Sequence, residues 1–378
     1  MMFADPKSHF IVANQADANG VLKAEDGVFT GILPANLNVS NTAFDWSGVR
    51  WTQMIWPLPT EERHRKTLMA HELFHRIEPK LNLPTHRGGE NAQLDTLEGR
   101  ITLQLELRAL THALQAQSDE ERRKAAADAV LFRSERYRLF PAAAAQEQAM
   151  EWNEGLAEYT GVRVGNATPE QRIDETLGDI SRLGEASTFV RSFPYATGPA
   201  YGLLLDRYFP GWHRALKAGD GYDTLLEKAL NYHLPADLQQ AVEQQATLYD
   251  GAALRASEVE RERKRQQILA QNRAKFVDGP ILILPLRKMR IQFNPSNLQP
   301  LETAGTVYAT MRITDEWGIL EATNGAMMKP DWSAVIVVAP SVSSGSSLKG
   351  AGWTLELKPG WKIVPGARKG DYILALGS

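Results

Sequence analysis

The stretch His71-Glu72-Leu73-Phe74-His75 carries two histidines four residues apart, with a glutamate directly after the first. On a helix this spacing places both rings on one face, so both reach one metal ion at about 2.0–2.1 Å. Glu72 projects beside that ion, where a carboxylate takes a proton from water and passes it to a leaving group. The pattern therefore predicts a helical metal site, with His71 and His75 as ligands and Glu72 as the catalytic residue.

A second motif, Asn153-Glu154-Gly155-Leu156-Ala157, strengthens this prediction, because two histidines alone also fit ordinary, partly buried helix residues. A catalytic zinc ion takes three protein ligands and keeps an open position for water. Glu154 would complete a His-His-Glu set from a second helix. Glu158, one turn further on, is placed to accept the free ring N–H of a ligating histidine. Glu151 shares this helical stripe, so the three carboxylates repel one another unless water, a cation or a metal meets them.

Together the two motifs resemble those of the gluzincin metallopeptidases, especially the aminopeptidase N and glycyl-aminopeptidase groups. The resemblance spans residues 60–205 and implies zinc as the cofactor, Glu154 as the third ligand and a peptide or protein substrate. Many gluzincins also use a tyrosine hydroxyl to stabilise the oxyanion, and Pro194-Tyr195-Ala196-Thr197-Gly198 fits their Tyr-x-x-Gly pattern. The resemblance therefore implies Tyr195 as a catalytic residue, with Tyr201 as the fallback and a purely structural tyrosine as the alternative.

Two features depart from the aminopeptidase N pattern. A long helical insertion separates His75 from Glu154, and the Gly-x-Met-Glu-Asn element that holds a free amine in that group is absent upstream of His71. The choice between exopeptidase and endopeptidase action therefore stays open. The insertion carries Glu98 and Glu106 on an apolar helix, where we expect ion pairs. The alternative is that either one serves the metal, even as the third ligand in place of Glu154.

Composition limits the class of function. A chain of 378 residues favours two domains. The net charge of -3 and the pI near 6.3 give no electrostatic footprint for nucleic acid. Because the chain has no cysteine, His, Asp and Glu must hold any transition metal, which favours zinc over an iron–sulfur cluster. We interpret His86 and His112 as ordinary polar residues, and we find no apolar run near the ~18 residues of a membrane span.

The pattern along the chain predicts an α+β protein of two domains. Residues 1–278 are expected to form a zincin-like metallopeptidase domain, β-rich over residues 1–59 and mainly helical over residues 60–278. Residues 279–378 carry short strands punctuated by Gly, Pro, Asn and Ser, which predicts a small β-sandwich.

Four local expectations follow. Thr60 is the predicted cap of the metal-site helix. The run Trp51 to Trp56 is the predicted edge strand beside the cleft, where an extended peptide would add through backbone hydrogen bonds. Pro199 suits the first position of a helix. Residues 306–313 read as one strand.

The function that these patterns favour is zinc-dependent hydrolysis of peptide bonds. Two alternatives are a non-catalytic zinc-binding or scaffold protein and a metallohydrolase of non-peptide amides or esters. The sequence assigns no oligomeric state, substrate sequence or compartment. Because peptidases that resemble this chain are often exported, the resemblance implies a periplasmic or secreted protein as an expectation.

Overall fold

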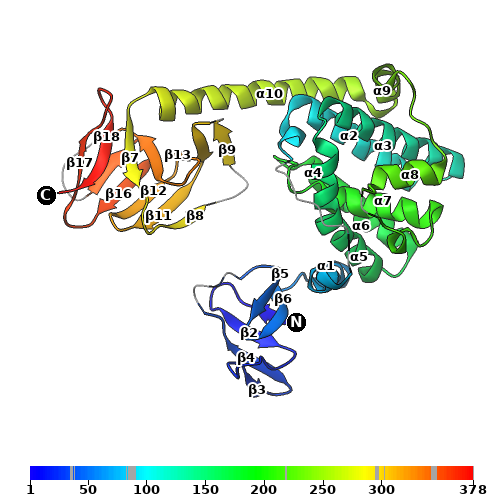
Figure 1. The fold of residues 1–378 in the computed structure, drawn as a ribbon, viewed down its shortest axis with the longest axis horizontal. Helices are drawn as coiled ribbons and strands as arrows, with labels where there is room; N and C mark the ends of the chain where they lie inside the picture. Colours follow the sequence, from blue (N-terminus) through cyan, green and yellow to red (C-terminus); the bar gives the residue numbers. More distant parts are fainter. Residues whose placement is uncertain are drawn as a thin grey trace. The chain divides into compact units, whose positions relative to one another are not determined.

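The computed structural model describes residues 1–34, 37, 39–81, 83, 91–217, 219–293, 298–301, 303–341 and 347–377. The fold is α+β, as predicted, with an N-terminal β-sheet, a mainly helical middle region and two C-terminal sheets (Figure 1). The chain divides into two compact units, Met1–Glu258 and Val259–Ser378. Within the described ranges, each helix is too short or too polar to cross a lipid bilayer.

The N-terminal sheet has six strands in the order β3-β4-β2-β1-β6-β5. Their bounds are β1 (Met2–Ala4), β2 (Phe10–Ala13), β3 (Lys23–Glu25), β4 (Val28–Ile32), β5 (Thr42–Trp46) and β6 (Val49–Ile55). The prediction that the run Trp51 to Trp56 forms the edge strand is wrong, because β1 pairs with β6 in parallel and places β6 inside the sheet. β5 takes the edge position, and β6 is buried along most of its length.

Helix α1 (Glu62–Ile77) carries the paired histidines. The prediction of Thr60 as its cap is wrong, because the helix begins one residue later than that cap requires. Glu61 is the N-cap, and its side chain makes no capping hydrogen bond. α1 packs on β5 and β6 and along α5 (Leu156–Gly165). Gly161 permits the close crossing with α5, since a Cβ atom there would lie 2.7 Å from the carbonyl oxygen of Thr67. The crossing sets the histidines opposite the acidic residues that lead into α5.

The middle region contains the remaining helices of the first unit. These are α2 (Leu97–Gln115), α3 (Asp119–Leu139), α4 (Ala143–Met150), α6 (Pro169–Gly184), α7 (Pro194–Tyr208), α8 (Tyr222–Leu230), α9 (Leu238–Ala246) and the start of α10 (Gly251–Arg273). A π-helical turn, η3 (Glu151–Gly155), joins α4 to α5 without a break in the helical path. Shorter turns complete the region: η1 (Glu78–Lys80), η2 (Ala92–Asp95), η4 (Trp212–Arg214) and η5 (Thr247–Tyr249).

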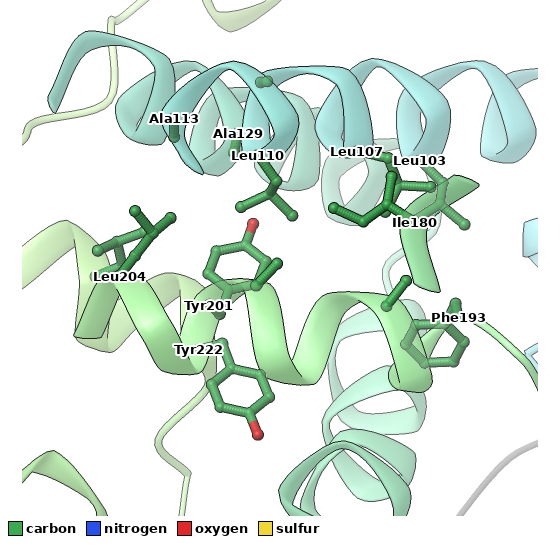
Figure 2. Packing of buried hydrophobic residues seen from close by; sticks show 14 of the residues in the cluster. Leu103, Leu107, Leu110, Ala113, Ala129, Ile180, Phe193, Tyr201, Leu204 and Tyr222 are labelled. Atoms are coloured by element: carbon green, nitrogen blue, oxygen red, sulfur yellow. The ribbon is translucent and has the colours of Figure 1, made fainter. Parts of the chain in front are cut away.

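One hydrophobic core holds these helices together. α2 is apolar on more than one side because both α3 and α7 pack against it. Figure 2 shows Tyr201 of α7 pointing toward α2, beside Leu110, with Leu204 one turn further along α7. The core thus joins the helix that carries Tyr195 to the long insertion between His75 and Glu154.

The second unit contains two sheets, in the orders β17-β18-β7-β14-β13-β10-β9 and β15-β16-β12-β11-β8. Their strand pairs are antiparallel, except that β18 pairs with β7 in parallel. It begins within α10 and continues through a π-helical turn, η6 (Ala274–Asp278). The strands are β7 (Ile281–Pro285), β8 (Arg290–Phe293), β9 (Leu298–Leu301), β10 (Gly305–Tyr308), β11 (Met311–Asp315), β12 (Gly318–Ala322), β13 (Ala326–Met328), β14 (Ala334–Val338), β15 (Ser347–Gly350), β16 (Trp353–Leu357), β17 (Trp361–Pro365) and β18 (Tyr372–Leu376).

Residues of both sheets meet in one cluster, which includes Leu282 and Val335 from the first sheet and Ile313 and Leu355 from the second. The two sheets therefore face each other across a shared core, as in a β-sandwich. The prediction of one strand over residues 306–313 is wrong. The chain crosses from one sheet to the other between β10 and β11, so the run contributes to both.

Candidate metal centre

His71 and His75 of α1 and Glu154 of η3 bring three ligand atoms together. The Nε2 atoms of the two histidines lie 3.1 Å apart, and Glu154 Oε2 lies 3.5 Å from His71 Nε2 and 3.4 Å from His75 Nε2. Ligand atoms bonded to zinc in a tetrahedron, at ~2.0–2.1 Å, stand about 3.3–3.4 Å from one another. The three atoms therefore have the spacing of three corners of a zinc tetrahedron. Their nitrogen and oxygen donors also suit that ion.

Glu154 reaches the histidines from the π-helical turn, in which backbone hydrogen bonds span five residues instead of four. This turn breaks the acidic stripe expected from the sequence. Glu151 points into the helical core and binds Arg133, whereas Glu154 and Glu158 contact the histidines of α1. Arg133 thus offsets the charge of Glu151, and the histidines contact the other two carboxylates. This arrangement reduces the repulsion that the three charges would have on one face of a regular helix.

Each histidine has a carboxylate on its other ring nitrogen. Glu158 Oε2 lies 2.7 Å from His71 Nδ1, and Glu78 Oε2 lies 3.3 Å from His75 Nδ1. The side chain of Asn153 donates to Glu78 at 3.1 Å. Such carboxylates fix the tautomer and the orientation of a ligating ring. Sequence reasoning missed Glu78, although its spacing of three residues from His75 is the signal that would have found it.

Glu72 is 6% exposed, and its Oε2 atom has no hydrogen-bond partner within the described part of the chain. Burial raises the pKa of this carboxyl, while the neighbouring His71 and His75 act in the opposite direction. A buried oxygen without a hydrogen-bond partner lowers the stability of the fold unless a water molecule or a ligand donates to it. Glu72 is therefore disposed to bind a water molecule beside the two rings.

Tyr195 lies at the start of α7 and is 37% exposed. Its ring stacks on the His71 ring with 5.6 Å between centroids, and its hydroxyl donates to Glu154 Oε2 at 2.8 Å. Burial, followed by the charge of Glu154, raises the pKa of Tyr195, so the hydroxyl stays a donor at neutral pH. The fallback residue, Tyr201, is fully buried and donates to Glu106 at 2.9 Å. The structure thus brings Tyr195 to the histidines and places Tyr201 in the core.

α7 approaches the π-helical turn closely because two glycines meet there. A Cβ atom on Gly198 would lie 2.4 Å from the Cα atom of Gly155. The helix begins at Pro194, so the prediction of Pro199 as its first residue is wrong; Pro199 lies inside the helix. Since proline has no N–H, the carbonyl of Tyr195 receives no helical hydrogen bond from it. The close contact holds the start of α7 beside Glu154.

Hydrogen bonds within the cluster shift the pKa values of its members. Burial lowers the pKa of His71, but hydrogen bonds with Glu154 and Glu158 outweigh burial and raise it to about 10. Burial also lowers the pKa of His75, which Glu154 and Glu78 raise to about 9. Burial raises the pKa of Glu154, yet its histidine partners hold it well below the usual range. The carboxylates therefore make the histidines hold their protons more tightly than free imidazole does, and a metal ion must displace those protons to bind.

The other candidate ligands lie in different surroundings. Glu98 pairs with Arg255 at 2.7 Å, and Glu106 pairs with two buried arginines of α3 at 2.7–2.8 Å. The expectation of ion pairs is confirmed for both residues. His112 packs against a tyrosine ring, with 4.9 Å between centroids. His86 lies outside the described residues.

Comparisons with protein-family models, with curated proteins and with solved structures found no match. The geometry and chemistry of the site are therefore the basis for a functional proposal.

Proposed function

We propose that this protein is a zinc-dependent hydrolase that cleaves peptide bonds. The observation that carries the proposal is the tetrahedral spacing of His71 Nε2, His75 Nε2 and Glu154 Oε2. The unpartnered carboxylate oxygen of Glu72, buried on the same helix, adds a base to this set. Both rings are also held through Nδ1, which is the usual support of a ligating histidine.

The residues fit a zinc ion in donor type and in spacing. His71, His75 and Glu154 would hold it and leave the fourth position open to water. When bound, zinc acts as a Lewis acid and lowers the pKa of water from ~15.7 toward ~7.

Glu72 and Tyr195 supply the proton transfer and the oxyanion contact. Glu72 accepts the proton of the attacking water and delivers it to the departing amine. Its raised pKa suits a group that must both take and give a proton near neutral pH. The hydroxyl of Tyr195 is protonated and donates a hydrogen bond to Glu154. It is the candidate donor of a hydrogen bond to the tetrahedral oxyanion.

The neighbouring sheet supports an extended peptide as the substrate. β5 is an edge strand and contacts α1, the helix that carries the histidines. Among the described strands, none pairs with the outer side of β5. The N–H and C=O groups of that side can pair with an added strand, which is a common mode of peptide recognition.

A panel of internally quenched peptides, with non-peptide amides and esters in parallel, tests the reaction class. Cleavage of a peptide bond that a chelator stops and added zinc restores would support the proposal. Turnover confined to the non-peptide substrates would favour the broader metallohydrolase. A zinc-loaded protein that cleaves none of them would favour a non-catalytic zinc-binding protein.

The zinc affinity is expected to increase with pH between about pH 6 and pH 8. The pKa values of His71 and His75 are raised to about 10 and about 9, so the pair holds a proton over this interval. A ligating ring must be neutral, so each displaced proton changes the affinity by about tenfold per pH unit. We expect at least one such proton, measured by calorimetric titration in two buffers of different ionisation enthalpy. An affinity that is constant over this interval would contradict the ligand assignment.

Tyr195→Phe is expected to lower kcat by about 100-fold while leaving the zinc affinity near the wild-type value. Loss of one oxyanion donor has an effect of this size. If the hydroxyl serves only to hold Glu154, the zinc affinity falls instead, which would contradict the oxyanion role. Tyr208→Phe is the matched control, because that hydroxyl lies on the same helix and donates to Asp119 at the surface.

A further inference from the structure

A buried ion pair anchors the π-helical turn from the side opposite the histidines. Glu151 and Arg133 are 1% and 0% exposed. The guanidinium of Arg133 makes two hydrogen bonds to the Glu151 carboxylate, at 2.9 Å and 2.7 Å. The hydroxyl of Thr197 on α7 donates to the same carboxylate at 2.6 Å. One carboxylate thus joins α3, the π-helical turn and α7, and a bidentate pair tolerates little displacement.

The π-helical turn needs such an anchor. This conformation is rare, and regular α-helix lies on both sides of it. If the turn relaxed to α-helix, Glu151 and Glu154 would return to neighbouring positions on one face, with their charges opposed. The bond to Arg133 opposes that change by holding Glu151 in the core. Thr197 extends the same constraint to α7, two residues after Tyr195.

We infer that Glu151, held by Arg133 and Thr197, is a positioning residue that sets the π-helical turn and so presents Glu154 to the metal. This inference rests on the proposed zinc site. It assigns to a buried ion pair a role in metal affinity, beyond its role in the stability of the helical core.

Glu147 provides a matched comparison. It lies four residues earlier, on α4, and pairs with Arg136 of α3 at 2.7 Å with both side chains 0% exposed. The two pairs therefore share the same chemistry, burial and partner helix. Glu147 differs in lying outside the π-helical turn.

The test compares Glu151→Gln with Glu147→Gln in the full chain. Thermal unfolding measures stability, and competition with a chromogenic chelator measures the Kd for zinc. We expect both variants to unfold at a lower temperature than the wild type. The Kd for zinc should rise by about 10- to 100-fold in Glu151→Gln, the range for loss of an outer partner. In Glu147→Gln it should stay within about twofold of the wild-type value.

Thr197→Val is the second variant, because it removes one hydrogen bond from Glu151 and keeps Arg133 in place. We expect the Kd of Thr197→Val for zinc to rise by less than that of Glu151→Gln. If Glu151→Gln does not fold, an unchanged Kd in Thr197→Val would overturn the inference. Equal Kd values for Glu151→Gln and the wild type, or equal rises in the two glutamine variants, would also overturn it. A wild-type protein that binds no zinc would overturn the proposed function itself, so the two failures are distinguishable.

Discussion

Glu72→Gln is expected to lower kcat/KM for peptide cleavage by about 10³-fold while leaving the zinc content unchanged. General acid–base catalysis by one side chain contributes about 10²–10⁴-fold. Glutamine keeps the shape of the side chain but accepts no proton from water. Glu72 is not among the three grouped ligand atoms, so its replacement should not release the ion. Turnover on a cleaved peptide and elemental mass spectrometry measure the two quantities.

The same substitution should leave the fold at least as stable as the wild type near pH 7. Burial raises the pKa of Glu72 in the folded protein. Such a group contributes stability below its unfolded pKa of about 4.3, and that contribution is lost as the pH rises through the folded pKa. Near neutral pH the buried charge therefore costs stability, which a neutral glutamine avoids. An unfolding temperature equal to or above that of the wild type is the expected result.

Glu62→Gln is the control for this experiment. Glu62 lies on the same helix, its side chain is 67% exposed, and it pairs with Lys66 at 2.6 Å. Exposed pairs of this kind contribute about 0–1 kcal/mol, so the variant should match the wild type in turnover and zinc content. Full turnover in zinc-loaded Glu72→Gln would assign the base to another group and remove the proposed proton transfer.

The candidate site is predictable from sequence where one helix determines it. The spacing of His71 and His75 needs only helical geometry, and so does the position of Glu72 beside them. The path of the second acidic segment is different, because a π-helical turn shifts every later side chain around the helix axis. That turn depends on the contact of Glu151 with Arg133, a residue of another helix, which a local pattern does not show.

The fold follows the same division. Short runs of apolar, β-branched and aromatic residues indicate strands such as β6 and β14, because these strands are buried along most of their length. The position of a strand in the order of its sheet depends on partner strands that are distant in sequence. β1 pairs with β6 and removes it from the edge, and the crossing between β10 and β11 divides a run that reads as one strand.

Glu154→Ala is expected to weaken zinc binding by more than about 100-fold. Its Oε2 atom lies 3.4–3.5 Å from both Nε2 atoms, so the substitution removes one corner of the tetrahedral set. The loss should exceed the ~10- to 100-fold that follows removal of an outer partner. Elemental mass spectrometry of the purified variant beside the wild type gives the first measurement, and chelator competition gives the Kd.

A graded set of variants separates a ligand from its supports. Glu158→Ala and Glu78→Ala each remove a carboxylate from Nδ1 of one histidine, so each should weaken zinc binding by about 10- to 100-fold. Glu98→Ala removes a pair with Arg255 and should leave the Kd unchanged. The order of effects is therefore Glu154 first, the two supports next and Glu98 last. If Glu154→Ala retains stoichiometric zinc, another residue is the third ligand. If the wild-type protein does not bind added zinc, the protein has no zinc-dependent function.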